Sequence, residues 1–151
     1  MLKTERCILS KLQSNDYNDV KKLYRDEKVR RYLGGIVDEE RCKIKFGDML
    51  NADSDSYYWM IREIEKKQFV GLVSLDLHHD GKSIELSYQL MPKWWGKGYG
   101  TEIIKEVINY GFEDIGLAKI LAETQTANKA SHRLLERDDM KFQGTVERFS
   151  G

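Results

Sequence analysis

The stretch that decides the fold spans Met91 to Phe112 and reads M-P-K-W-W-G-K-G-Y-G-T-E-I-I-K-E-V-I-N-Y-G-F. A strand-like segment, residues 83–90, leads into Pro92, the only proline of the chain. Three glycines then alternate with Lys97 and Tyr99, and a helical pattern follows. One face of that helix is predicted to carry Ile103, Ile104, Val107, Ile108 and Gly111.

A glycine-rich turn that opens a helix leaves backbone N–H groups without intrahelical partners, and the helix dipole adds partial positive charge there. Alternating glycines also let successive N–H groups converge into an anion-binding nest. The stretch therefore predicts a phosphate-binding turn. A tight turn without a ligand is the competing interpretation.

The composition predicts one globular domain, residues 1–151, with 40% hydrophobic residues. The 25 basic and 25 acidic residues cancel, which argues against a nucleic-acid-binding protein. No apolar run approaches the roughly 18 residues of a membrane span, and residues 1–6 lack the hydrophobic core of a signal peptide. Because Cys7 and Cys42 are the only cysteines, no disulfide framework is indicated, and we expect a cytoplasmic protein.

Hydrophobic periodicity and turn residues predict the remaining elements. The expected helices cover residues 17–24, 26–33 and 39–50, with Asn15 or Asp16 capping the first and Asp38 the third, and a last helix begins at Asn128. The expected strands cover residues 6–12, 57–64, 69–77, 83–90, 119–124 and 140–146.

Three consecutive strands with short turns form an antiparallel meander, and the strand, helix and strand between residues 83 and 124 form a right-handed parallel crossover. The fold class is therefore α+β, a mixed, mostly antiparallel sheet whose helices pack on its faces. The glycine turn lies at the carboxyl end of the strand that enters the crossover, where sheets with parallel strands bind ligands.

Two common glycine-rich motifs do not fit. A P-loop needs Gly-Lys followed by Ser or Thr, whereas Lys97 is followed by Gly98. A dinucleotide fingerprint starting at Gly96 needs Gly or Ala where Thr101 stands.

The stretch instead resembles the acetyl-coenzyme A motif of the GNAT superfamily of N-acetyltransferases, whose core is Gln or Arg, two residues, Gly, one residue, and Gly or Ala. Gly98 and Gly100 fit that core, and Trp95 stands where Gln or Arg is usual. An aromatic residue there, within W-G-K-G-Y-G-T-E, is similar to the RimJ/RimL branch. Three more stretches resemble that branch in the same order: T-E-R-C-I-L-S-K-L, I-E-L-S-Y-Q-L and A-N-K-A-S-H-R-L-L-E.

The resemblance implies a GNAT fold and the transfer of an acetyl group from acetyl-CoA to a primary amine, either a protein N-terminus or a small molecule, by direct attack in a ternary complex. It implies that the pyrophosphate is held by backbone N–H groups of Gly96, Lys97, Gly98, Gly100 and Thr101. It also implies that the pantetheine arm pairs, like a substitute strand, with Gln89, Leu90 and Met91.

Glu85 matches a glutamate that serves as general base in parts of the superfamily. A protonated alkyl amine has a pKa of about 10 and must lose a proton before it attacks the thioester. A solvent-facing strand residue is the competing interpretation. By the same resemblance, Asn128 reaches the pantetheine and Ser131 helps protonate the departing thiolate, whereas a helix N-cap and an ordinary helix serine are the alternatives.

The chain departs from the family pattern in its last part. Asp138, Asp139 and Met140 stand where relatives usually have Leu-Gly-Phe or a similar turn, and relatives generally continue into a seventh strand. We therefore expect the last strand to be missing and the sixth to be an exposed edge, which a homodimer would cover.

Two expectations remain. His78, His79 and His132 lack metal-ligand spacing, so no metal is expected. A non-catalytic acyl-CoA-binding module with the same fold is the alternative to an enzyme, because the fold alone does not choose between them.

Overall fold

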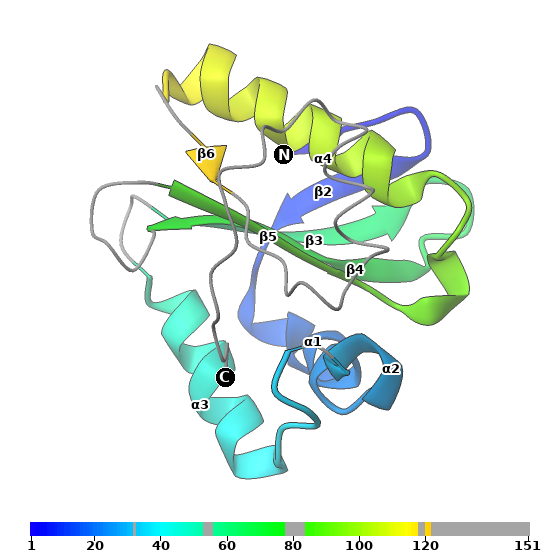
Figure 1. Ribbon diagram of the computed structural model, residues 1–151, viewed down its shortest axis with the longest axis vertical. Coiled ribbons are helices and arrows are strands. Elements are labelled where there is room, and N and C mark those ends of the chain that lie inside the picture. Colours follow the sequence, from blue (N-terminus) through cyan, green and yellow to red (C-terminus); the bar gives the residue numbers. More distant parts are fainter. Residues whose placement is uncertain (32, 53–55, 78–83, 118–119, 122–151) are drawn as a thin grey trace.

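The computed structural model describes residues 1–31, 33–52, 56–77, 84–117 and 120–121 (Figure 1). In this part of the chain, six strands form one sheet in the order β1-β2-β3-β4-β5-β6. They are β1 (Leu2–Lys3), β2 (Cys7–Lys11), β3 (Tyr57–Glu63), β4 (Phe69–Leu77), β5 (Ile84–Leu90) and β6 (Ile120–Leu121). The pairs from β1 to β5 are antiparallel, and β5 pairs with β6 in parallel. The predicted mixed, mostly antiparallel sheet with one parallel crossover is confirmed.

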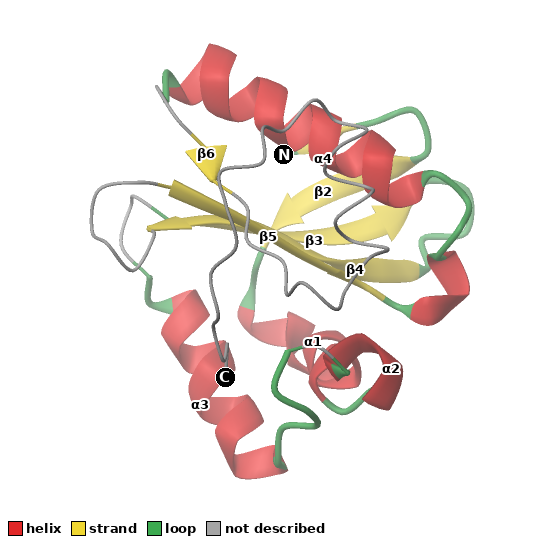
Figure 2. Cartoon of the chain, in the orientation of Figure 1, coloured by secondary structure: helices red, strands yellow, loops and turns green. Residues whose placement is uncertain are grey.

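Helices cover both faces of the sheet (Figure 2). One face carries α1 (Tyr17–Tyr24), α2 (Glu27–Arg30) and α3 (Glu39–Leu50). The other face carries α4 (Tyr99–Asn109), which continues as a π-helical turn through Tyr110–Ile115. The three-layer arrangement follows from strands whose two faces are both apolar and each need a cover.

Each layer has its own core, because successive strand residues point to opposite faces. Under α4, Ile103, Ile104 and Val107 pack with sheet residues such as Leu75 and Leu86, and all five are buried. This confirms the apolar face predicted for the helix after the glycine turn.

On the opposite face, Val20, Leu23, Cys42 and Phe46 pack against residues of the sheet that include Met60. The second core holds α1 and α3 against the sheet. It therefore fixes the position of α1 and α3 on the face of the sheet opposite α4.

The cap predicted for α3 is observed, whereas the one predicted for α1 is not. The Asp38 carboxylate accepts a hydrogen bond from the Arg41 N–H at 2.9 Å, and α3 has the predicted bounds. Asp16 lies at the N-cap position of α1, but its side chain makes no cap there, because it accepts hydrogen bonds from the Gln13 N–H and from Arg62 instead.

Two details differ from the sequence-based expectation. The apolar spacing of residues 39–50 predicts that Leu50 shares a buried stripe with Cys42, Phe46 and Met49. Leu50 is instead 38% exposed, since it is the last residue of the helix and borders a polar loop. Strand β1 was not predicted; two residues carry no usable periodicity, and only their pairing with Ile8 and Leu9 defines them as a strand. The predicted helix from Asn128 and the strand 140–146 lie outside the described residues.

At Gly71 the backbone of β5 lies too close to β4 to leave room for a side chain. A Cβ built on it would lie 2.0 Å from the Gln89 carbonyl oxygen and 2.9 Å from the Leu90 Cα. We expect Gly71→Ala to lower the free energy of unfolding by about 2 kcal/mol or more, because backbone atoms cannot move aside cheaply. Urea denaturation measures this.

Gly47→Ala is the matched control, because nothing lies within 4 Å of a Cβ built there, inside α3. It is expected to raise the free energy of unfolding by about 0.5 to 1 kcal/mol through helix propensity. Equal effects of the two substitutions would contradict the close approach of β4 to β5.

Candidate functional site

The turn between β5 and α4 is shaped by two glycines in the left-handed region. Gly96 has φ +73° and Gly98 has φ +83°, and Gly98 is the N-cap residue of α4. Only glycine adopts these angles without a steric penalty from Cβ. The glycines thus curl the chain into the helix start, as the sequence predicts.

The backbone N–H groups of this turn have no hydrogen-bond partner within the described chain. These unpaired N–H groups belong to Gly96, Lys97, Gly98, Gly100 and Thr101. The first intrahelical bond of α4 runs from the Glu102 N–H to the Gly98 carbonyl at 3.1 Å. Together with the dipole of an 11-residue helix, the unpaired groups make a place for an anion.

Trp95, the residue at the unusual motif position, ties the turn back to the sheet. Its indole Nε1–H donates to the Leu90 carbonyl at 2.8 Å, while 47% of the residue remains exposed. An aromatic side chain at this position therefore has a structural role in fixing the strand-to-turn angle. The Trp95 hydrogen bond uses the Leu90 carbonyl and none of the unpaired N–H groups of the turn.

The end of β5 presents only part of the backbone that the resemblance assigns to pantetheine. The Met91 N–H donates to the Val70 carbonyl at 2.8 Å, so it faces β4. Backbone direction alternates along an antiparallel ladder, so Gln89 also faces β4 and Leu90 faces the opposite edge. Among the three predicted residues, Leu90 is the one whose backbone N–H is placed to meet a ligand, because its carbonyl accepts the Trp95 hydrogen bond.

Glu85 faces away from α4. Ile84 and Leu86 pack in the core under α4, so the period-2 alternation turns Glu85 toward the layer of α1 and α3. It is half-buried, and the Ser87 hydroxyl donates to its Oε1 at 3.3 Å. Glu85 is therefore only partly exposed to solvent, and its role as general base stays a prediction.

Asp76 is the site residue that sequence reasoning missed. It lies directly opposite Glu85 in the β4–β5 ladder, which puts the two carboxylates on one face. Its carboxylate accepts hydrogen bonds from the Ser56 and Tyr58 hydroxyls. Burial, followed by the hydrogen bond to Asp76, raises the pKa of Tyr58, so this hydroxyl stays protonated as a donor. The available signal was the cross-strand register implied by the hairpin between β4 and β5.

The T-E-R stretch before β2 lies against the first turn of α4. The Glu102 carboxylate accepts from the Thr4 hydroxyl at 2.5 Å, the Arg6 N–H at 2.9 Å and the Arg6 Nε at 2.8 Å. These hydrogen bonds join residues that are separated by 96 and 98 positions along the sequence. The contact brings together two of the motifs that carry the resemblance.

A match to a family model identifies the family to which this chain belongs. The sequence model described as an acetyltransferase (GNAT) domain matches residues 6–141. The chain belongs to the GNAT acetyltransferase family. The predicted superfamily and fold are confirmed, and the enzyme class is that of an N-acetyltransferase.

Three relatives illustrate the similarity. A Bacillus subtilis (strain 168) protein named uncharacterized N-acetyltransferase YoaA is 26% identical over 99% of this chain and 87% of its own length. A GNAT-family acetyltransferase structure from Bacillus anthracis is 26% identical, covers 95% of this chain and 84% of its own, and has a TM-score of 0.81. The spermidine N-acetyltransferase of Vibrio cholerae, solved with CoA and spermine, is 19% identical, covers 87% and 79%, and has a TM-score of 0.75, which shows a shared fold.

Two predicted site residues, Asn128 and Ser131, lie outside the described part of this GNAT chain. The three histidines for which no metal role is predicted, His78, His79 and His132, also lie outside it. Among the described residues, no group of three or more His, Cys, Asp or Glu side chains could hold a metal ion. No described helix has the length and apolar character needed to cross a membrane.

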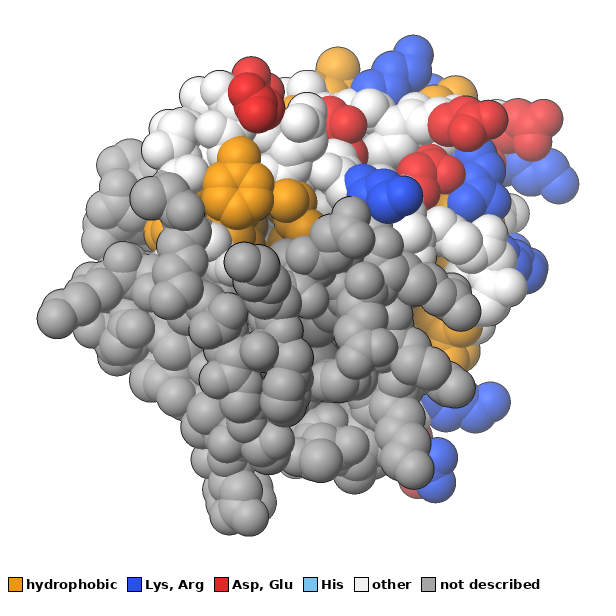
Figure 3. Space-filling view, turned by 45° about the horizontal axis from the view of Figure 1, so that its top comes forward, with side chains coloured by type: hydrophobic (Ala, Val, Ile, Leu, Met, Phe, Trp, Pro, Cys, Tyr) orange, Lys and Arg blue, Asp and Glu red, His pale blue; other side chains and the backbone are white. Residues whose placement is uncertain are grey.

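Charge is mixed on the surface around α4. Figure 3 turns this helix toward the viewer, and basic and acidic side chains lie side by side among the coloured residues. On that described surface, charge of one sign does not gather into a broad patch. A phosphate at the glycine turn would therefore meet the local backbone N–H groups and not a general positive field.

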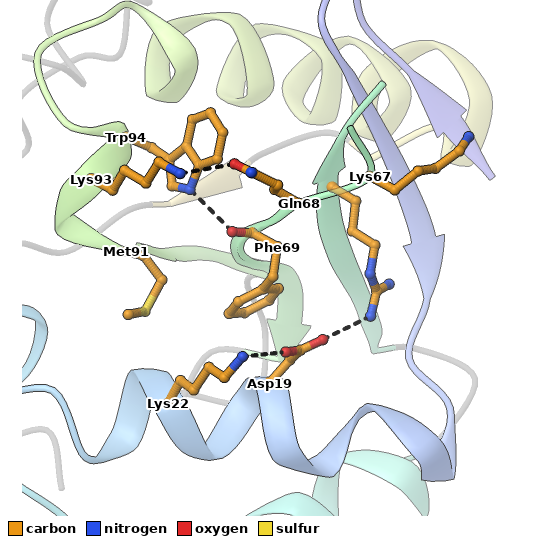
Figure 4. A pocket seen from close by; sticks show the side chains of 9 residues that line it. Asp19, Lys22, Lys67, Gln68, Phe69, Met91, Lys93 and Trp94 are labelled. Carbon is orange, nitrogen blue, oxygen red and sulfur yellow. Dashed lines mark hydrogen bonds and ion pairs between the residues drawn. The ribbon is translucent and has the colours of Figure 1, made fainter. Parts of the chain in front are cut away.

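A surface pocket of about 390 Å³ opens between α1, the β3–β4 turn and the start of the glycine stretch (Figure 4). Several of its charged side chains pair with one another: Lys22 with Asp19 at 3.1 Å, and Arg62 with Asp19 at 3.1 Å. Lys93 donates to the Gln68 side chain at 2.9 Å. Met91 is the one predicted site residue in its lining.

The Glu102 network predicts a pH-dependent contribution to stability. Burial raises the pKa of Glu102, but hydrogen bonds from Thr4 and Arg6 outweigh it, so the folded-state pKa is lowered. A lowered carboxyl pKa stabilises the fold above the unfolded pKa of about 4.3, and that stabilisation is lost as pH falls through the folded value.

Glu102→Gln is expected to lower the free energy of unfolding by about 1 kcal/mol at pH 7, and the difference from wild type should vanish as pH falls below 4. Urea denaturation between pH 7 and pH 3 checks this. The exposed Glu113, changed to Gln, serves as the control and should leave the pH profile unchanged. A difference that is constant with pH would contradict the assigned network.

Proposed function

We propose that this GNAT protein transfers an acetyl group from acetyl-CoA to a primary amine by direct attack in a ternary complex. The observation that carries the proposal is the set of unpaired N–H groups at Gly96 to Thr101, at the start of α4. A pyrophosphate supplies the negative oxygens that such a nest binds. The proposal also assigns the chain to the RimJ/RimL-like branch, because the T-E-R stretch and the Trp95 motif both resemble it.

The cosubstrate is proposed to lie along the end of β5 and the glycine turn. Leu90 is the strand residue whose main chain faces away from β4, so it is the proposed partner of the pantetheine arm. The N–H groups of Gly96, Lys97, Gly98, Gly100 and Thr101 are the proposed partners of the pyrophosphate. Lys97 is exposed and adds a positive charge at the same turn.

Direct attack by the amine is favoured over an acyl-enzyme. Both cysteines are buried, and burial raises the pKa of Cys7 to about 11 and also raises that of Cys42. A buried thiol that stays protonated is a poor nucleophile. The amine must then carry out the attack itself, which requires that it first lose its proton.

Glu85 is the proposed general base, and Asp76 opposite it is a second negative group on the same face. Two carboxylates favour an acceptor that is positively charged near the reacting amine. We therefore propose small-molecule amines with more than one amino group as the preferred class, with protein N-termini as the second class. The spermidine acetyltransferase with the same fold acts on such a polyamine.

The remaining roles stay predictions about residues outside the described part. Asn128 is proposed to contact pantetheine, and Ser131 to help protonate the departing thiolate. A cytoplasmic location and a homodimer belong to the same proposal.

An amine panel with thiol release as the readout tests the proposal. The panel contains N-terminal peptides, polyamines, amino acids and aminoglycosides. We expect acetyl-CoA to bind and a polyamine to be acetylated at a higher kcat/KM than a monoamine of similar size. Tight CoA binding without turnover of any amine would favour the non-catalytic acyl-CoA-binding module, and no binding of CoA would refute both.

Glu85→Gln is expected to lower kcat on the order of 100-fold near pH 7 while changing the CoA Kd less than two-fold, because only proton removal is lost. The deficit should shrink as pH approaches the amine pKa of about 10, since more amine is then already neutral. Steady-state kinetics across pH measures both effects.

Glu65→Gln is the matched control, because Glu65 is exposed in the β3–β4 turn, away from β5. It should leave kcat and the pH profile unchanged. A loss in Glu85→Gln that is the same at every pH would contradict the role of general base.

A further inference from the structure

Arg6 holds the glycine turn from the side opposite to the proposed pyrophosphate. Its Nη1 donates to the Lys97 carbonyl at 3.1 Å, and its Nε donates to Glu102 at 2.8 Å. Its guanidinium lies 3.9 Å from the centroid of the Tyr99 ring. One side chain from the β1–β2 connection therefore contacts three residues of the turn and the first helical turn.

The bond to the Lys97 carbonyl fixes the direction of a neighbouring N–H. A trans peptide is planar, and its C=O and N–H point in opposite directions. When Arg6 holds the Lys97 carbonyl, the Gly98 N–H on the same peptide must point away from Arg6. Gly96 and Gly98 flank this region with positive φ, so without a fixed partner the peptide has little to prevent it from rotating.

We propose that Arg6 is a positioning residue for the pyrophosphate of the acetyl donor: it locks the Lys97–Gly98 peptide so that the Gly98 N–H faces the nest. The inference rests on the proposed function, because it takes the turn as the pyrophosphate site. It adds a residue from the start of the chain to the acetyl-donor site, whose residues by the resemblance all lie between residues 89 and 131.

Glu102 and Thr4 hold Arg6 in place. Glu102 accepts three hydrogen bonds from Thr4 and Arg6, and its side chain is only 17% exposed. The hydrogen bond to Glu102 is the main cause that raises the pKa of Arg6. A carboxylate one turn behind a phosphate site would repel the ligand if left alone, so its pairing with Arg6 also neutralises an unfavourable charge.

Gly98 also lies beside Arg6. A Cβ built on Gly98 would lie 3.4 Å from the Arg6 Nη2, an ordinary van der Waals distance. Arg6 therefore borders the turn directly at the residue whose N–H it orients. The contacts of Arg6 are all made by a rigid, planar fork with fixed donor directions, which lysine lacks.

A purely structural ion pair would give different kinetics. If Arg6 only anchored the β1–β2 connection, its loss would affect every acetyl donor alike. If Arg6 orders the nest, its loss affects a donor that carries pyrophosphate and spares one that lacks it. Acetyl-CoA and S-acetylpantetheine differ in this respect and share the reacting thioester.

The test compares Arg6→Met with wild type on these two donors, using one amine from the panel. We expect kcat/KM for acetyl-CoA to fall on the order of ten-fold, mainly through KM. The reason is that the charge-assisted hydrogen bond from Arg6 to the Lys97 carbonyl, which orients the Gly98 N–H, is lost. The kcat/KM for S-acetylpantetheine should stay within two-fold. Arg6→Lys, which keeps the charge, should show the same donor selectivity with a smaller loss, and it replaces Arg6→Met if that variant does not fold.

Lys21→Met is the control, because it breaks a 2.6 Å ion pair with Glu39 on the opposite layer and should leave both donors unaffected. Equal losses on both donors, or no loss on either, would overturn the role of Arg6 while the proposed acetyltransferase function stands. If wild type neither bound CoA nor used either donor, the proposed function itself would fail. The two failures are therefore distinguishable.

Discussion

The packing of α4 on the sheet is the constraint on which the site depends. Ile103, Ile104 and Val107 are buried against the strands, so the helix cannot rotate without exposing its apolar face. This places the start of the helix over the end of β5, where the glycine turn must connect them. The unpaired N–H groups of that turn are therefore held in one position by apolar burial about one helical turn away. The anion site and the core are parts of one element.

The two faces of the sheet serve different purposes in this GNAT domain. The α4 face supplies one of the two cores and, at its edge, the glycine turn with the Arg6–Glu102 contact. The opposite face carries the carboxylates of Glu85 and Asp76, toward the layer of α1 and α3. Strand β5 connects the two, because its side chains alternate between faces while its end leads into the turn. A donor held at the turn and an amine held beside Glu85 would thus approach the same strand from different sides.

Much of this arrangement could be predicted because local signals agreed with the tertiary fold. Asp38 marked the start of α3, and the alternating pattern of residues 69–77 marked β4 with its observed bounds. The predictions that differed concerned residues whose role depends on distant partners. Asp16 bonds to Gln13 and Arg62 instead of capping α1. Asp76 was missed because its importance comes from cross-strand register, which periodicity does not fix.

The sequence by itself determined the elements, their order and the glycine turn, because capping residues, period-2 alternation and left-handed glycines act over a few residues. The motifs at residues 4–12 and 95–102 were also visible in it, as separate signals. Only the tertiary structure showed that Thr4, Arg6 and Glu102 form one contact, and that Glu85 stands opposite Asp76. These pairings join residues far apart along the chain, and they exist only after both cores have closed and brought the strands into register.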